Sequence, residues 1–339
     1  MVVVEIMAMV LILIFCESVS YAASKRIIVI ETMPVPVVIE HSRWFKSNMA
    51  ALGYTDGKNA EFVMIKAEGS RNRALKLLRK ALDAKKTDIV VTFATLASQA
   101  AWEVLKDSGT PVLFSVVSDP VGAGLIQKVG DPTGTNITGT VATISRETKI
   151  EMVLKILKKK AGAGKIRFGS VYSSYPSSIG DITGLKEIAA KMKNVEFISY
   201  ELPYRNLPEG LETMLIDYAR GIKALEPKVD YWWQTSGPLY EVEDTTHLQM
   251  KLSKLPVAYG VTLRSVELGA LMTINADFRE GGKETARLAD LILKGTPPGN
   301  IPVIAPKNFN MGLNLKTAMD IGVTIPSDMM SLAGKHIYQ

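Results

Sequence analysis

The fold is decided by the stretch 88–98, which reads DIVVTFATLAS. After its first residue, the segment up to Phe93 is a run of apolar and β-branched side chains, typical of a strand that is buried on both faces. Small and hydroxyl-bearing residues follow, and an apolar periodicity then predicts a helix over 95–106. A second buried strand is predicted over 111–117, so the three elements form a β-α-β unit.

Similar units extend from this stretch in both directions. Toward the N-terminus, strands are predicted at 26–31 and 62–65, each followed by a helix. Toward the C-terminus, a short helix is predicted at 122–128, and a second run of alternating strands and helices begins near residue 142. The strands of this second run are predicted at 166–172, 195–200, 229–234, 256–259 and 270–275, with two more near Ile301 and Asn308.

Strands that are apolar throughout and alternate with helices indicate parallel sheets covered on both faces. Two such runs predict an α/β protein with two doubly wound domains. Ligands of open α/β sheets bind beyond the carboxyl ends of the strands, and two facing domains place those ends around one cleft. We therefore expect the functional site between the domains.

Length and composition agree with two globular domains. The chain has 339 residues, about twice the usual domain length of roughly 150, with 47% hydrophobic and 22% charged residues. Its single cysteine excludes a disulfide framework and a metal site built on paired thiolates. The three histidines, His41, His247 and His336, are too scattered for a metal cluster. We expect neither a metal nor a cofactor.

The N-terminus resembles an export signal. Residues 6–15 form an apolar run that is too short for a membrane-spanning helix of about 20 residues but fits the core of a signal peptide. Ser20 and Ala22 are small residues at the positions required for cleavage before Ala23, although no Lys or Arg precedes the run. We expect a signal peptide over 1–22 and a periplasmic or other extracytoplasmic location. Cys16 allows the alternative of a lipid anchor, which the bulky Phe15 disfavours.

The net charge of +6 does not indicate a nucleic-acid surface. Such a surface needs clustered Lys and Arg with aromatic residues between them. The densest cluster, Lys155 with the lysines at 158–160, ends a predicted amphipathic helix, where cations complement the helix dipole. We expect no nucleic-acid partner.

Hydroxyl-bearing residues follow four of the predicted strands. They are Thr95 and Ser98, Ser118 with Asp119, Ser173 with Ser174, and Thr235 with Ser236. Free backbone N–H groups at helix starts can hold a carboxylate, so the pattern suits a small anionic or zwitterionic ligand. Each residue taken alone is more simply explained as a helix cap. Because several of them are expected around one cleft, we give a role in ligand binding the same weight as a role in helix capping.

Aromatic residues gather at the strand ends of the second domain. They are Tyr172, Tyr175, Trp232, Trp233, Tyr240 and Tyr259. These residues could form a stacking wall for a ligand. Because Trp232 and Trp233 are adjacent on one strand, they point to opposite faces, and at most one of them can face a given side.

Catalytic motifs are missing from the sequence. The segment 122–127, GAGLIQ, lacks the third glycine of a dinucleotide fingerprint, and 162–165, GAGK, precedes a strand where a phosphate-binding loop would follow one. No nucleophile-elbow motif G-x-S-x-G is present. We assign no catalytic residue and expect a protein that is not an enzyme.

Three segments carry a family resemblance. They are 92–101, TFATLASQAA, then 110–125, TPVLFSVVSDPVGAGL, and 136–139, NITG. They resemble the tryptophan/tyrosine-type substrate-binding proteins of ABC transporters, and the run SDPVGAGL is the most specific part. The resemblance covers nearly the whole chain after the signal. It implies a type I periplasmic-binding-protein fold, in which three crossovers join two lobes that close on a ligand.

The resemblance also implies the site. Thr95, Leu96 and Ala97 match the helix start that receives the ligand's carboxylate, and Ser118 and Asp119 match the next contact of the first lobe. In the second lobe, the matching positions are Tyr172, Ser173, Ser174, Thr235 and Ser236, and we add Tyr259 from the aromatic wall. Asp277 matches an acidic residue suited to an ammonium group. The loop 32–36 lacks the family's histidine-proline pattern, and SGP at 236–238 replaces a more polar segment, so the ligand stays open.

On this basis we expect an exported, monomeric receptor that binds an amino acid, possibly aromatic, and delivers it to an ABC permease in the membrane. The first lobe would comprise 25–141 and 272–304, and the second 142–271 and 305–339. One alternative is a two-domain glycosyltransferase or epimerase acting on a nucleotide sugar. Another is the effector domain of a transcription regulator, for which the residues before the first strand leave no room for a DNA-binding motif.

Overall fold

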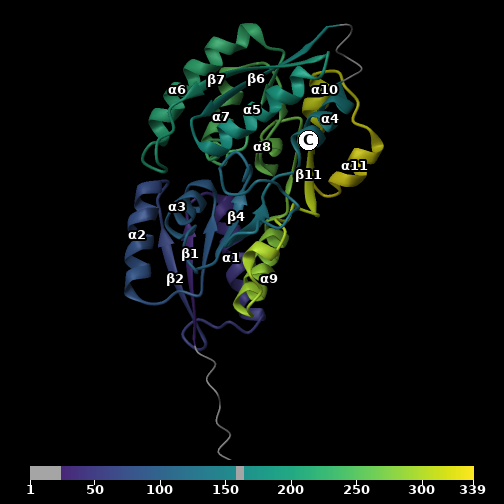
Figure 1. The fold of residues 1–339 in the computed structure, drawn as a ribbon. Coiled ribbons are helices and arrows are strands. Elements are labelled where there is room, and N and C mark those ends of the chain that lie inside the picture. The colour runs from purple at the N-terminus through teal and green to yellow at the C-terminus, as the bar shows by residue number, and fades with distance from the viewer. Residues whose placement is uncertain (1–23, 158–163) are drawn as a thin grey trace, which may run out of the picture.

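The computed structural model describes residues 24–157 and 164–339, which form two α/β lobes (Figure 1). The predicted signal peptide at 1–22 and the lysines at 158–160 lie outside the described residues. The lobe that begins the chain lies at the bottom of Figure 1, and the second lobe lies above it.

The first lobe is built on a parallel sheet with the strand order β2-β1-β3-β4-β5. Side chains of β1 alternate between the two faces, and Ile27 to Ile30 are all fully buried because helices cover both faces. The strands are β1 (Lys25–Glu31), β2 (Ala60–Lys66), β3 (Ile89–Phe93), β4 (Val112–Val117) and β5 (Ile137–Val141).

Two pairs of helices cover this sheet. On one face, α1 (Pro36–Ala51) packs against α9 (Phe278–Leu293), although the two are far apart in the sequence. On the other face lie α2 (Arg71–Ala84) and α3 (Thr95–Leu105). The hydroxyl of Ser70 accepts a hydrogen bond from the backbone N–H of Arg73 and so caps α2.

The second lobe contains a mixed sheet with the order β12-β11-β10-β9-β8-β6-β7, in which only the pairing of β10 with β11 is antiparallel among the described pairs. Its strands are β6 (Ile166–Ser173), β7 (Val195–Leu202), β8 (Tyr231–Trp233), β9 (Val257–Tyr259), β10 (Met272–Ala276), β11 (Phe309–Asn314) and β12 (Ile337–Tyr338). Trp232 and Trp233 are fully buried and belong to different core clusters, so they face opposite sides of the sheet as predicted.

Helices also cover both faces of the second sheet. They are α4 (Arg146–Leu157), α5 (Pro176–Ala190), α6 (Leu211–Leu225), α7 (Glu243–Leu252), α8 (Leu263–Glu267), α10 (Leu315–Asp320) and α11 (Ser327–Ala333). Residues of α4 and α5 pack in the core cluster that contains Trp233, whereas α6 packs in the cluster that contains Trp232. No described helix is long and apolar enough to span a bilayer.

The chain crosses between the lobes three times. The first crossover lies between β5 and α4, and the second lies at Asp277, between β10 and α9. The third follows Ile304, which bridges to Thr140 in the first lobe before β11 joins the second sheet. The prediction of two α/β lobes joined by three crossovers is confirmed.

Two local predictions are corrected by the structure. The strand at 272–276, assigned above to the first lobe, belongs to the second, because it pairs with β9 and β11. The segment 122–128 forms turns instead of a helix, since Asp119 accepts a hydrogen bond from Gly122 N–H and Gly124 has a φ of 72°. In addition, β5 was not among the predicted strands.

Candidate functional site

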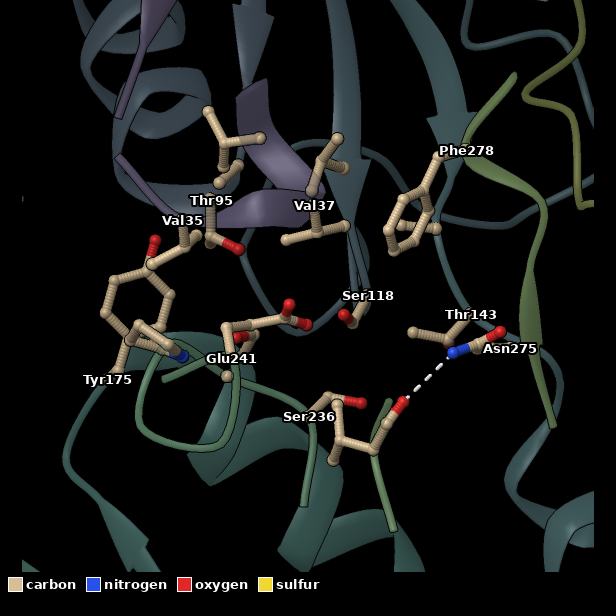
Figure 2. Close-up of a pocket in the computed structure, with 18 of the residues that line it drawn as sticks. Val35, Val37, Thr95, Ser118, Thr143, Tyr175, Ser236, Glu241, Asn275 and Phe278 are labelled. Carbon is tan, nitrogen blue, oxygen red and sulfur yellow. Dashed lines mark hydrogen bonds between the residues drawn. The ribbon is translucent and has the colours of Figure 1, made fainter. Parts of the chain in front are cut away.

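A pocket lies between the lobes, where the carboxyl ends of the strands of both sheets meet (Figure 2). Most of its lining comes from loops that directly follow a strand. The first lobe contributes Met33, Val35, Val37, Val38, Ala94, Thr95, Val116 and Ser118. The second lobe contributes Lys149, Tyr175, Ser177, Ser236, Gly237, Pro238, Glu241, Tyr259, Val261, Ile274 and Asn275, and the crossovers add Ala142, Thr143 and Phe278.

The first-lobe wall of the pocket is mainly apolar. It is formed by the chain that leaves β1 and starts α1, with Met33, Val35 and Val38 all nearly fully buried. Val37 and Phe278 point toward the pocket from the same side in Figure 2. This wall can bury an apolar part of a ligand.

Backbone strain is concentrated at this wall. Ala94, at the start of α3, has a φ of 78°, and Val116, in β4, has a φ of 58°. Positive φ is uncommon for residues other than glycine, and it is a true outlier for a β-branched valine. The register between β4 and β5 also shifts between Phe114 and Val117. Such irregularities recur next to binding sites, where they redirect side chains.

Lys149 places a buried cation in the opposite wall. Its exposed fraction is 4%, and its Nζ lies 5.6 Å from the centroid of the Tyr259 ring. Burial lowers the pKa of Lys149, and the nearby charge of Asp181 acts in the opposite direction. Among the described residues, no carboxylate oxygen lies within 4.0 Å of its ammonium group.

Glu241, which is half-buried, adds a carboxyl group to the same pocket. In Figure 2 its carboxyl group points toward the middle of the pocket, on the side of Ser118. Its Oε2 is buried and finds no hydrogen-bond partner within the described part of the chain. Burial raises the pKa of Glu241 to about 7. The pocket therefore contains two charged groups of opposite sign that lack a protein counter-ion there.

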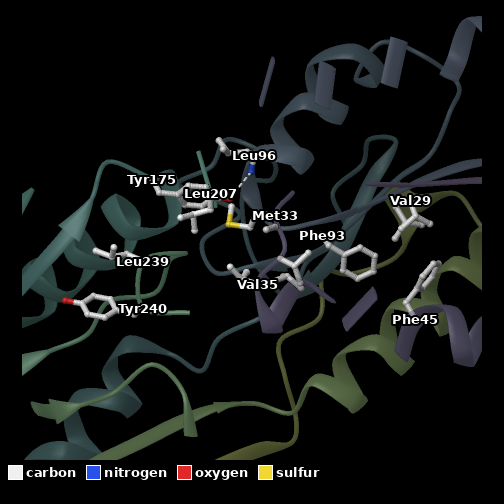
Figure 3. Packing of buried hydrophobic residues seen from close by; sticks show 14 of the residues in the cluster. Val29, Met33, Val35, Phe45, Phe93, Leu96, Tyr175, Leu207, Leu239 and Tyr240 are labelled. Carbon is white, nitrogen blue, oxygen red and sulfur yellow. Dashed lines mark hydrogen bonds between the residues drawn. The ribbon is translucent and has the colours of Figure 1, made fainter. Parts of the chain in front are cut away.

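Tyr175 reaches across from the second lobe to the start of α3. Its hydroxyl accepts a long hydrogen bond of 3.5 Å from the backbone N–H of Leu96, and the side chain is almost fully buried (Figure 3). Its ring also contacts the ring of Tyr204, whose hydroxyl donates to the carbonyl of Gly69 in the first lobe at 3.2 Å. The two tyrosines thus hold the lobes together beside the pocket.

Arg146 forms a second link between the lobes. Its Nη2 donates to Oδ2 of Asp119 in the first lobe at 3.1 Å, and its Nε donates to Oδ1 of Asp181 at 3.0 Å. The other oxygen of Asp181 accepts a hydrogen bond of 2.8 Å from the backbone N–H of Ser236 in the pocket wall. The ion pairs therefore connect closure of the lobes to the position of a pocket-lining loop.

The sequence matches the family of ABC transporter substrate binding proteins over residues 26–337. This chain belongs to that family. A curated relative, the tyrosine-binding protein of Clostridioides difficile (strain R20291), is 26% identical over 283 residues, which are 82% of this chain and 75% of the relative.

Solved structures with the same fold cover nearly the whole substrate binding protein. An ABC domain from Streptococcus pneumonia in complex with L-Trp has a TM-score of 0.75 and 22% identity, over 94% of this chain and 100% of that one. A conserved domain protein from Vibrio cholerae has a TM-score of 0.76 and 24% identity, over 93% and 100% of the two chains.

Four residues predicted for the site of this substrate binding protein line the pocket: Thr95, Ser118, Ser236 and Tyr259. Three more lie in contacts next to it. The backbone N–H of Leu96 donates to Tyr175, the N–H of Ala97 donates to the hydroxyl of Thr32 at 3.2 Å, and Asp119 pairs with Arg146. At the helix start that was expected to hold a carboxylate, these two N–H groups thus donate to side-chain hydroxyls of the protein itself.

The remaining predicted residues do not line the pocket. Tyr172 donates to Glu201 at 2.8 Å, and the hydroxyl of Ser174 accepts from the backbone of Tyr204. The hydroxyls of Ser173 and Thr235 are buried and have no hydrogen-bond partner among the residues described. Asp277 caps α9 by accepting from the N–H groups of Arg279 and Glu280.

Replacing Asp277 with alanine is expected to lower the free energy of unfolding by about 1 kcal/mol, because α9 loses its N-cap. Chemical denaturation of the empty protein measures this change. Asp277→Asn retains a capping oxygen and serves as the control, so it should lose much less. Equal stability of Asp277→Ala and the wild type would contradict a capping role.

Sequence reasoning missed the two buried charges of this substrate binding protein. Lys149 does leave a signal, because it shares the buried face of α4 with Val153 and Ile156, where an apolar residue would be expected. Glu241 lies in a loop, where its burial depends on both lobes. Asn275 donates to the carbonyl of Val261 at 3.2 Å, and nothing in its local sequence indicates a pocket position.

No group of three or more His, Cys, Asp or Glu side chains in 24–157 and 164–339 is arranged to hold a metal ion. His41 does not line this pocket. His41 is buried against Phe278, and burial lowers its pKa to about 4.

Proposed function

We propose that this substrate binding protein captures an amino acid in the pocket between its lobes and delivers it unchanged to an ABC permease. The observation that carries the proposal is the pair of charged groups, the buried Lys149 and the half-buried Glu241 with its buried Oε2, within a pocket whose other wall is apolar. A small solute with a carboxylate, an ammonium group and an apolar side chain matches this lining. The names of the relatives that bind tyrosine and L-Trp make aromatic amino acids the first candidates.

In this proposal the protein works as a monomer outside the cytoplasm and has no catalytic role. Membership in a family of transport proteins supports this, and it disfavours the alternative of an enzyme acting on a nucleotide sugar. Thr95, Ser118, Ser236 and Tyr259 are proposed as further ligand contacts. Ligand binding would favour the closed arrangement, because the ligand touches both lobes only when they meet.

The proposal predicts stabilisation by a true ligand. At a concentration of 100 Kd, the ligand should raise the free energy of unfolding by about 2.7 kcal/mol. Thermal-shift measurements with the 20 common amino acids, followed by calorimetry of those that stabilise the protein, provide the test. UDP-glucose is the control for the enzyme alternative. Stabilisation by the nucleotide sugar, or by none of the amino acids, would contradict the proposal.

A further inference from the structure

The carboxylate site expected from the sequence is not free. That site is the start of α3, where the backbone N–H of Leu96 donates to the hydroxyl of Tyr175 and the N–H of Ala97 donates to Thr32. A carboxylate that used these donors would have to displace the hydroxyl of Tyr175 from Leu96 and that of Thr32 from Ala97, and both residues are almost fully buried. The anion of a ligand needs another partner.

Lys149 is such a partner. Its ammonium group is buried in the pocket wall beside Tyr259. The closest source of negative charge, Asp181, already uses one oxygen for Arg146 and the other for the backbone of Ser236. A buried cation without a counter-ion is costly, and a bound carboxylate would remove that cost.

Glu241 has the complementary requirement. Its buried Oε2 has no hydrogen-bond donor in the described part of the chain. Lys149 does not fill this role, because no oxygen of Glu241 lies within 4.0 Å of its ammonium group. The two groups thus line one pocket without forming an ion pair with each other.

Both charged groups come from the second lobe. Lys149 lies on α4 and Glu241 lies just before α7. The first lobe instead contributes the apolar side chains Met33, Val35 and Val38. A ligand that meets these walls together has its polar ends on the second lobe and its side chain against the first.

We propose that Lys149 binds the carboxylate of the captured amino acid and that Glu241 binds its ammonium group. This assignment rests on the proposed function. It makes the pocket prefer free zwitterions with an apolar side chain over amines or acids that carry only one of the two groups.

Calorimetry with matched ligands tests the assignment. The probes are L-tryptophan, tryptamine, which lacks the carboxylate, and indole-3-propionate, which lacks the ammonium group. L-tyrosine, tyramine and 3-(4-hydroxyphenyl)propionate form a parallel series. Lys149→Met should weaken binding of the amino acid by about 10- to 100-fold and that of the propionate similarly, while the amine changes less than about threefold. Glu241→Gln should show the reverse pattern, with the amine weakened and the propionate unaffected.

Exposed residues supply the control variants. Glu151 lies on the outer side of α4, and Lys251 lies on α7, and both are exposed. Glu151→Gln and Lys251→Met should leave all affinities unchanged. Because methionine replaces a buried charge with an apolar group of similar length, the melting temperature of empty Lys149→Met should not fall. If that variant does not fold, Lys149→Gln serves in its place.

The outcomes separate the two proposals. If the wild type binds no amino acid, the proposed function fails before the variants are compared. If it binds L-tryptophan or L-tyrosine but Lys149→Met and Glu241→Gln weaken all probes of that series equally, the assignment is overturned. It is also overturned if the two patterns are exchanged, or if neither variant changes the affinity.

Discussion

In the Arg146→Met variant, the lobes of the empty protein should lie further apart, and ligand binding should be weaker by about 10-fold. The arginine joins Asp119 of the first lobe to Asp181 of the second, and Asp181 has an exposed side-chain fraction of only 5%. Removing the cation leaves that carboxylate buried without an ion-pair partner, so the free energy of unfolding should fall by about 3 kcal/mol. The apparent affinity falls because less of the protein occupies the closed, binding-competent arrangement.

Small-angle X-ray scattering and urea denaturation measure these two effects separately. Asp119→Asn breaks only the contact between the lobes, because Arg146 keeps Asp181. It should increase the radius of gyration while changing the stability much less. Arg220→Met removes an exposed pair with Asp217 within α6 and is the matched control. An unchanged radius of gyration in both Arg146→Met and Asp119→Asn would show that the ion pair does not hold the lobes together.

Glu241→Gln should stabilise the empty protein, and increasingly so as the pH rises. Burial raises the pKa of Glu241 to about 7 in the folded protein, above its unfolded value. The folded state therefore binds the proton of Glu241 more tightly than the unfolded state does. The contribution of this proton to stability is fully present below about pH 4.5 and is lost as the pH rises through about 7. The difference between variant and wild type should grow by up to about 3 kcal/mol over this interval.

Urea denaturation of both proteins between pH 4.5 and 8.5 checks this prediction. Other charged groups near the same opening, such as Glu243, Asp277 and Arg279, are present in both proteins, so their contributions cancel. The lowered pKa of His41 affects both proteins equally as well.

In the wild type, affinity for an amino acid should also rise from pH 6 to 8, because the ionised carboxylate of Glu241 binds the ammonium group better. Parallel stability curves would contradict the burial of an unpaired carboxylate.

The sequence predicts the β-α units well because their signals are local. The buried strand at 88–93 and the helix after it were both placed from apolar patterns, and β3 and α3 agree within a residue or two. It cannot show which sheet a strand joins, and so Met272–Ala276 was assigned to the wrong lobe. Short helices such as α8 and α10 contain too few turns for a periodic pattern.

The site was less predictable because it depends on closure. The hydroxyl residues predicted after strands include Ser118 and Ser236, which line the pocket and follow the carboxyl ends of their strands. The role of Tyr175 at the start of α3 comes from a contact between residues 79 positions apart in the chain. Likewise, the Oε2 of Glu241 is buried in a pocket lined by several segments of both lobes, so no pattern near Glu241 indicates that burial.

The apolar wall comes largely from one short piece of chain, the stretch 33–38 between β1 and α1. With the charged ends of the solute assigned elsewhere, substitutions confined to these six consecutive positions would exchange one hydrophobic cargo for another without disturbing how its main-chain atoms are held. Receptors for different apolar solutes would then differ mainly in this stretch. These six positions are therefore the ones to randomise when a receptor for a new nutrient is sought.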